Sequence, residues 1–82
     1  MARICLANHK GDQVIAIYEP ANHESVQVAQ QKLTAFLEEC VSRYGKEPPV
    51  WARRTGSAEY DLFDGDLSQV EEVLLQYPLV GG

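Results

Sequence analysis

The sequence predicts a single α+β domain with the element order ββαββα, an antiparallel sheet of about four strands and two helices packed on one face. Three observations predict this fold. Short β-branched or alternating runs occur in two pairs, a long amphipathic segment separates the pairs, and a second helical pattern follows the last run. The 82 residues, 45% of them hydrophobic and 23% charged, leave room for one hydrophobic core.

The first pair of runs predicts a β-hairpin. Residues 3–9 place Ile4 and Leu6 on one side and Cys5 and Ala7 on the other, which is the two-sided apolar pattern of a mostly buried strand. A polar turn that contains glycine follows. The β-branched run 13–18 then supplies the second strand.

The central segment predicts an amphipathic helix of about 22 residues. Asn22 is the expected N-cap, Glu24 lies in the first turn, and Gly45 suits the left-handed position just past the end. Apolar side chains recur at three- and four-residue spacing: Val26, Ala29, Leu33, Phe36, Leu37, Cys40, Val41 and Tyr44.

The second pair of runs, 50–55 and 58–63, predicts another hairpin around Gly56 and Ser57. We expect one face of this hairpin to present the same set of side chains from both strands: Val50, Ala52, Tyr60 and Leu62.

The segment 67–77 is open to two interpretations. Ser68 followed three residues later by Glu71 forms a capping box, and one apolar stripe continues it: Leu67, Val70, Val73, Leu74 and Tyr77. These features favour a helix that Pro78 ends. The alternative is a short strand over 73–77.

Composition excludes several classes of protein. The cysteine content is too low for a disulfide-stabilised secreted domain, and no apolar run reaches the length of a signal peptide or membrane span. We therefore expect a cytoplasmic protein that does not act at a membrane. The net charge is −5, and residues 55–82 contain six acids and no lysine or arginine. That imbalance disfavours nucleic acid as a partner.

The candidate catalytic and metal-binding patterns are weak. A thiol enzyme would pair Cys5 or Cys40 with His9 or His23, but both cysteines fall on apolar patterns typical of a core. The two histidines lack further zinc ligands at useful spacing. The acids of 61–72 do not fit a calcium loop, because the glycine is out of register. We expect a non-enzymatic protein without metal or cofactor.

An aromatic and basic cluster on the second hairpin, together with neighbouring acids, is the leading candidate site: Trp51, Arg53, Arg54, Tyr60, Asp61, Asp64 and Asp66. Trp and Arg are enriched at protein interfaces, and acids steer basic partners. The sequence therefore predicts a protein-interaction module that binds another protein or a second copy of itself. A platform for single-stranded nucleic acid is the less favoured alternative.

The end of the sequence supports a second functional hypothesis. Pro78, Leu79, Val80, Gly81 and Gly82 form a diglycine tail that resembles the tail of the ubiquitin-like sulfur carriers of molybdopterin and thiamine synthesis. The resemblance implies that the carboxylate of Gly82 is adenylated by a partner enzyme. The chain departs from that family in its long first helix and in the capping box that replaces the expected approach to the last strand. It also departs in the position of Asp64, Gly65 and Asp66, which lie about five residues too far from the tail.

Overall fold

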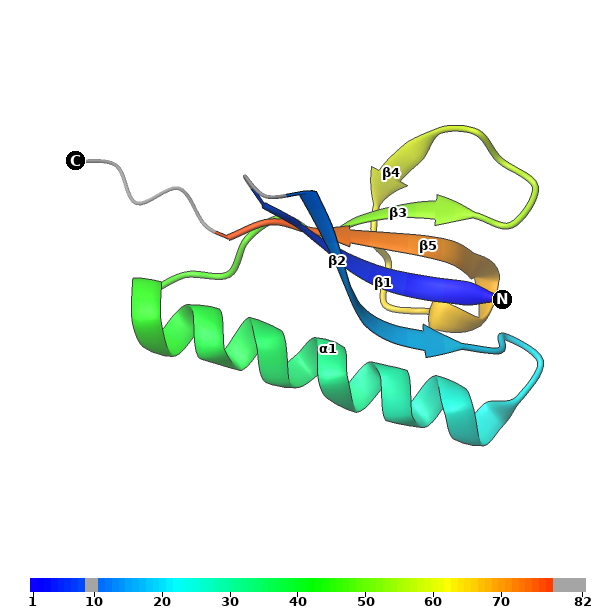
Figure 1. Ribbon diagram of the computed structural model, residues 1–82, viewed down its shortest axis with the longest axis horizontal. Coiled ribbons are helices and arrows are strands. Elements are labelled where there is room, and N and C mark those ends of the chain that lie inside the picture. The colour runs from blue at the N-terminus through cyan, green and yellow to red at the C-terminus, as the bar shows by residue number, and fades with distance from the viewer. Residues whose placement is uncertain (9–10, 78–82) are drawn as a thin grey trace.

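The computed structural model describes residues 1–8 and 11–77 and consists of a mixed five-stranded sheet and one long helix (Figure 1). The elements follow the chain in this order: β1 (Ala2–Asn8), β2 (Gly11–Tyr18), α1 (His23–Tyr44), β3 (Trp51–Arg54), β4 (Tyr60–Leu62), the 3-10 turn η1 (Leu67–Gln69) and β5 (Val70–Leu75).

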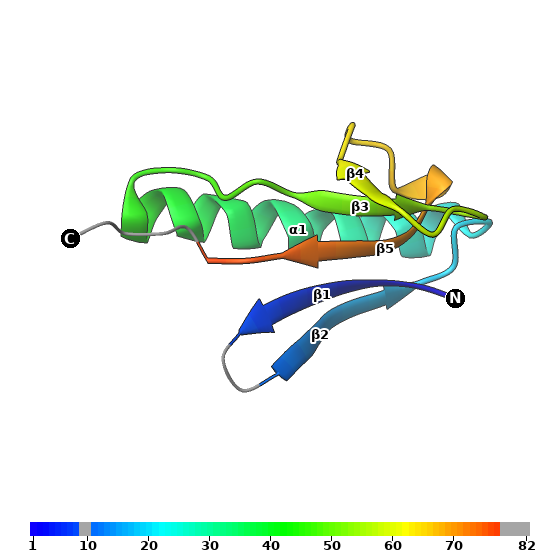
Figure 2. The same cartoon turned by 90° about the horizontal axis from the view of Figure 1, so that it is seen from above.

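The strand order across the sheet is β2-β1-β5-β3-β4 (Figure 2). β5, the last strand in the chain, lies between β1 and β3 and runs parallel to β1, whereas the other three pairings are antiparallel. α1 lies along one face of this sheet (Figure 1). The α+β class and the single domain agree with the prediction. The purely antiparallel sheet of about four strands and the second helix are wrong.

The first hairpin forms as predicted, with bounds that differ from the predicted ones by one or two residues. Ile4 and Leu6 are buried on the helix side, and Cys5, which points the other way, is also buried. The pairing shifts by one residue between Ile4 and Cys5, so Ile15 is an extra residue on β2. Such a bulge bends the strand, and it allows Ile15 to pack against the core although its neighbour Ala16 does the same.

The predicted helix is confirmed at both ends. The Asn22 side chain accepts a hydrogen bond from the Ser25 amide at 3.1 Å, and Gly45 closes the helix with φ 78°. The apolar stripe faces the sheet at Ala29, Leu33 and Cys40. Val41, which the stripe included, is 44% exposed because it lies at the margin of that face.

The segment 67–77 is the principal correction. It forms η1 and then β5, because Asp66 rather than Ser68 caps the turn: the Asp66 side chain accepts from the Ser68 amide at 3.0 Å. Val70 already has extended backbone angles. The strand alternative is therefore the observed one, although β5 starts and ends earlier than 73–77.

The helical appearance of this segment has two local causes. Leu67 is the first residue of the three-residue turn η1 and Val70 directly follows the turn, and both are buried. A register shift opposite Arg53 and Arg54 makes Glu71 an extra residue, so Val70 and Val73 both face the core although they are three positions apart. Apolar residues thus recur every third position without a helix.

The second hairpin forms between shorter strands, with a different facing from the prediction. Ala52 is buried on the helix side, and Val50 packs partly against the core. The register pairs Trp51 with Leu62 and Arg53 with Tyr60, which places Tyr60 and Leu62 on the opposite face of the sheet. The prediction that one face presents Val50, Ala52, Tyr60 and Leu62 is therefore wrong. In β4 it is Asp61, not Tyr60 or Leu62, that is paired with Ala52.

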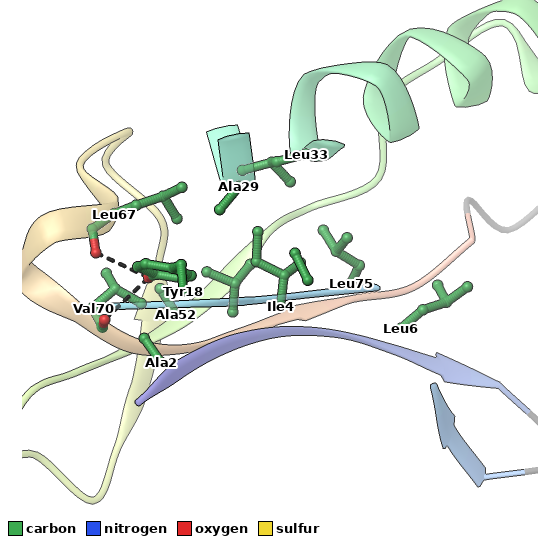
Figure 3. Close-up of a cluster of buried hydrophobic side chains, with 12 residues drawn as sticks. Ala2, Ile4, Leu6, Tyr18, Ala29, Leu33, Ala52, Leu67, Val70 and Leu75 are labelled. Atoms are coloured by element: carbon green, nitrogen blue, oxygen red, sulfur yellow. Dashed lines mark hydrogen bonds between the residues drawn. The ribbon is translucent and has the colours of Figure 1, made fainter. Parts of the chain in front are cut away.

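The core lies between α1 and the sheet (Figure 3). Its largest fully buried side chains come from β1, β2, α1, η1 and β5: Ile4, Tyr18, Leu33, Cys40, Leu67, Val73 and Leu75. Phe36 and Leu37 pack partly against the core cluster, so the long helix covers one face of the sheet as its stripe predicts.

Candidate functional site

The face of the sheet opposite α1 carries a row of apolar side chains that crosses all five strands. Cys5 is paired with Val14 on one side and Leu74 on the other, and Trp51 is paired with Leu74 and Leu62. Paired residues of neighbouring strands share a face. We call these five residues the apolar row: Val14, Cys5, Leu74, Trp51 and Leu62.

Exposure along the apolar row is lowest at Cys5, intermediate at Leu74, and higher at Val14, Trp51 and Leu62. Cys5 is 4% exposed and Leu74 is partly buried, whereas Val14 is 47%, Trp51 36% and Leu62 66% exposed. Most large apolar side chains of a small domain gain free energy by burial, at about 25 cal/mol for each Å² removed from water. Trp51 and Leu62, which are paired with each other, are the adjacent exposed members of the row, and adjoining exposed apolar side chains are typical of protein contact surfaces.

A second row lies beside the apolar row, one pleat further along the strands. Its members are paired across the same five strands and form what we call the charged row: Ile17, Arg3, Glu72, Arg53 and Tyr60. Arg3 Nε donates to Glu72 Oε2 at 2.7 Å, and the Tyr60 hydroxyl donates to the other oxygen of Glu72. Arg53 Nη1 donates to Glu71 Oε2 at 3.1 Å.

Glu72 is the electrostatic centre of the charged row. The hydrogen bond from Tyr60 and the adjacent Arg3 guanidinium lower the pKa of this carboxyl below its ordinary value of 4.5. Glu72 is the shielded member of its ion pair, because its side chain is 12% exposed whereas that of Arg3 is 57% exposed. The pair therefore presents its guanidinium to the surface.

The structure brings three of the predicted site residues together and separates the others. Trp51, Arg53 and Tyr60 lie on the face of the sheet opposite α1, which we call the helix-free face. Arg54 forms an ion pair with Asp64 at 3.0 Å. Asp66 caps η1, and Asp61 is paired with the buried residue Ala52, which places it toward the other face at the edge of the sheet.

Sequence analysis missed much of this face. It also includes residues that were not predicted: Val14, Ile17, Arg3, Leu74 and Glu72. The alternation in 3–9 and 13–18 already separated two sets of side chains, and it could have identified those from β1 and β2. The contribution of β5 depended on recognising 70–75 as a strand.

The reactive-thiol hypothesis gains no support from the geometry. Cys5 and Cys40 are both buried, and burial raises the pKa of each thiol, whereas a nucleophilic cysteine requires a lowered one. His23 lies in the first turn of α1, within 3.2 Å of the Gln27 side chain. His9 lies outside the described residues.

Residues 1–8 and 11–77 contain no cluster of three or more His, Cys, Asp or Glu side chains that could hold a metal ion. Within the same residues, no helix has the length and hydropathy needed to span a membrane. An open hollow is lined by Met1, Ala2, Glu19, Pro20, Thr55 and Glu71. Of its two carboxylates, that of Glu71 is already engaged by Arg53.

The chain that leaves β5 is anchored to the last turns of α1. The Tyr77 ring lies 5.7 Å from that of Phe36 and 6.1 Å from that of Tyr44, measured between centroids. These contacts hold the chain five residues before Gly82. The proposed activation site, Gly82 itself, lies outside the described residues.

No protein-family model, no curated protein and no solved structure matches this chain.

Proposed function

We propose that this chain is a non-catalytic cytoplasmic carrier protein of the ubiquitin-like kind. In this proposal the helix-free face docks on a partner enzyme, and the carboxylate of Gly82 is the group that the partner activates. The carboxylate attacks the α-phosphorus of ATP, which forms an acyl-adenylate and releases pyrophosphate. A sulfur or amine nucleophile then displaces AMP from the acyl group.

The observation that carries this proposal is the position of β5. The order β2-β1-β5-β3-β4, with parallel β1 and β5 in the centre and α1 across one face, corresponds to the β-grasp arrangement of these carriers. Residues 70–75 form a strand, which removes the departure from the family that the capping box implied. The length of α1 remains a departure.

The path of the chain after β5 also supports a carrier. β5 is a central strand, so its end is flanked by β1 and β3, and the chain leaves from the middle of one end of the sheet. The Tyr77 ring then lies against two aromatic rings of α1, those of Phe36 and Tyr44. Because Tyr77 has a defined position on the domain, a partner that binds the domain meets the residues after Tyr77 at a defined distance from its binding surface.

The test is mass spectrometry of the protein isolated from its native host. A carrier carries a thiocarboxylate or a conjugate at Gly82, and deletion of Gly81 and Gly82 abolishes this modification while the domain stays folded. Leu79→Ala serves as the control, because it alters the same segment and keeps both glycines. An unmodified Gly82 under conditions in which the protein functions, or function retained after the deletion, contradicts the proposal.

A second candidate is a protein-interaction module that acts without activation of its tail. The exposed apolar row favours it, because this row offers contact surface regardless of residues 78–82. Its partner is a basic protein, steered by acids of 59–72, or a second copy of the chain. In this case the deletion of Gly81 and Gly82 leaves function unchanged, and sedimentation reveals whether the chain self-associates.

A further inference from the structure

The last two turns of α1 lie beyond the main hydrophobic core. The core cluster takes Ala29 and Leu33 from α1 and has further side chains of this helix packed against it as far as Leu37. None of the residues 38–44, all of which the structure describes, belongs to that cluster, although Cys40 is buried. Figure 1 shows these turns and the chain that leaves β5 extending toward the same end of the molecule.

At this end of the molecule α1 contacts the chain after β5. The centroid of the Tyr77 ring lies 5.7 Å from that of Phe36 and 6.1 Å from that of Tyr44, within the range in which aromatic rings attract one another. We call these three side chains the ring triad. Phe36 and Tyr44 are about 12 Å apart along the helix axis, so two separate turns of α1 contact one residue of the following chain.

The backbone at Tyr77 is restricted as well. The next residue in the sequence is Pro78, and a proline ring disfavours helical backbone angles at the residue before it. Tyr77 therefore combines a ring that α1 contacts with a backbone that favours extended conformations. Both restrictions act on the direction in which the chain leaves the domain.

We propose that the ring triad positions the carboxylate of Gly82 for the activating enzyme, with Phe36 and Tyr44 acting through Tyr77. This inference rests on the proposed function and identifies the contacts of the domain that present its reacting group. Gly82 is five residues after Tyr77, and five residues span at most about 18 Å. The active site of the enzyme must come that close to Tyr77, whose side chain is 49% exposed.

The ring triad also gives the length of α1 a role. A shorter helix that ended after the core contacts would lack Tyr44 and one of the two contacts to Tyr77. Reaction rates in enzyme active sites are sensitive to placement, and a displacement of about 1 Å can lower a rate about 100-fold. Loss of the ring triad widens the range of positions open to the chain after Tyr77, so we expect slower activation.

The test compares full-length variants produced in the native host, in which mass spectrometry measures the modified fraction of Gly82. Tyr77→Ala removes the ring triad from the side of the chain end, and Tyr44→Ala removes one of its contacts from the side of the helix. Tyr77→Phe keeps all three rings. Gln76→Ala, which alters the exposed neighbour of Tyr77, is the matched control.

Tyr77→Ala and Tyr44→Ala are each expected to lower the modified fraction at least fivefold. The double variant is expected to fall no further than Tyr77→Ala alone, because Tyr44 acts through the Tyr77 ring. Tyr77→Phe and Gln76→Ala retain the wild-type fraction. NMR relaxation gives a readout that does not depend on activation: the order parameter of the Tyr77 amide is expected to fall from about 0.85 in wild type to below about 0.6 in Tyr44→Ala.

A wild-type modified fraction in Tyr77→Ala overturns the positioning role and leaves the carrier function standing. Reductions that multiply in the double variant also overturn it, because the two rings then act separately. A lowered fraction together with the amide spectrum of an unfolded chain shows that the ring triad only stabilises the fold. An unchanged Tyr77 order parameter in Tyr44→Ala overturns the contact itself, and an unmodified Gly82 in wild type overturns the carrier function together with this inference.

Discussion

The hydroxyl of Tyr18 donates to the carbonyl oxygen of Leu67 at 2.9 Å, across 49 residues of sequence (Figure 3). The same hydroxyl lies 3.1 Å from the carbonyl oxygen of Val70, so one proton is shared between two acceptors. Tyr18 is 1% exposed. It thereby fixes the turn η1, and with it the start of β5, to the end of β2.

Replacement of Tyr18 by Phe is expected to destabilise the domain by about 1–3 kcal/mol. The ring can still fill its place in the core, but two buried carbonyl groups lose their side-chain donor. Denaturant unfolding measures the change. Tyr77→Phe is the matched control, because the Tyr77 side chain is 49% exposed and its variant is expected to unfold within about 0.5 kcal/mol of wild type. Equal stability of Tyr18→Phe and wild type contradicts this role.

The same tyrosine predicts a loss of stability in alkali. Burial raises the pKa of Tyr18 from the ordinary value of 10 to about 12. Between these values the unfolded chain loses the phenolic proton and the folded chain keeps it, so unfolding becomes easier as pH rises. The contribution is complete below pH 10 and lost as pH rises through 12. Comparison of wild type with Tyr18→Phe across this range isolates it, and parallel curves for the two proteins disprove it.

Glu72 predicts the opposite dependence in acid. Its folded pKa lies below 4.5, so its interactions with Tyr60 and Arg3 contribute fully above pH 4.5 and are lost as pH falls through the folded value. Glu72→Gln is expected to be less stable than wild type at pH 7, with the difference vanishing at low pH. Urea unfolding at several pH values measures it.

The control for Glu72 is Glu59→Gln, which removes an exposed acid from the same part of the chain. This variant is expected to retain the acid dependence of wild type. If Glu72→Gln retains it as well, the carboxyl of Glu72 is not the group responsible.

Local sequence patterns predict the elements that local interactions determine. The helix from His23 to Tyr44 has its cap, its stripe and its left-handed glycine within its own sequence. The first hairpin likewise depends on alternation and one short turn. The segment after Asp66 differs, because its conformation depends on β1 and β3, which lie far away in the sequence and provide both neighbours of β5. Its capping box and three-residue spacing indicated a helix that those pairings override.

Only the part of the candidate site that lies on the second hairpin can be predicted from the sequence. Trp51, Arg53 and Tyr60 were identified from residue type, and they do share a face. The acids Asp64 and Asp66 do not lie on that face, because Asp64 pairs with Arg54 and Asp66 caps η1. The rows themselves arise from register between five strands, and composition carries no information on register.

Trp51→Ala is expected to weaken association through the helix-free face by about 2 kcal/mol or more, a decrease of about 30-fold in affinity, without unfolding the domain. The side chain lies next to Leu74 of the central strand and does not belong to the core cluster, so its loss removes contact surface rather than internal packing. Sedimentation and capture of the partner from the native host measure the association, and denaturant unfolding verifies the fold. Val28→Ala, which removes apolar surface from the helix, is expected to bind as wild type does. Equal affinities for Trp51→Ala and wild type would place the contact elsewhere on the molecule and leave the apolar row without an anchor.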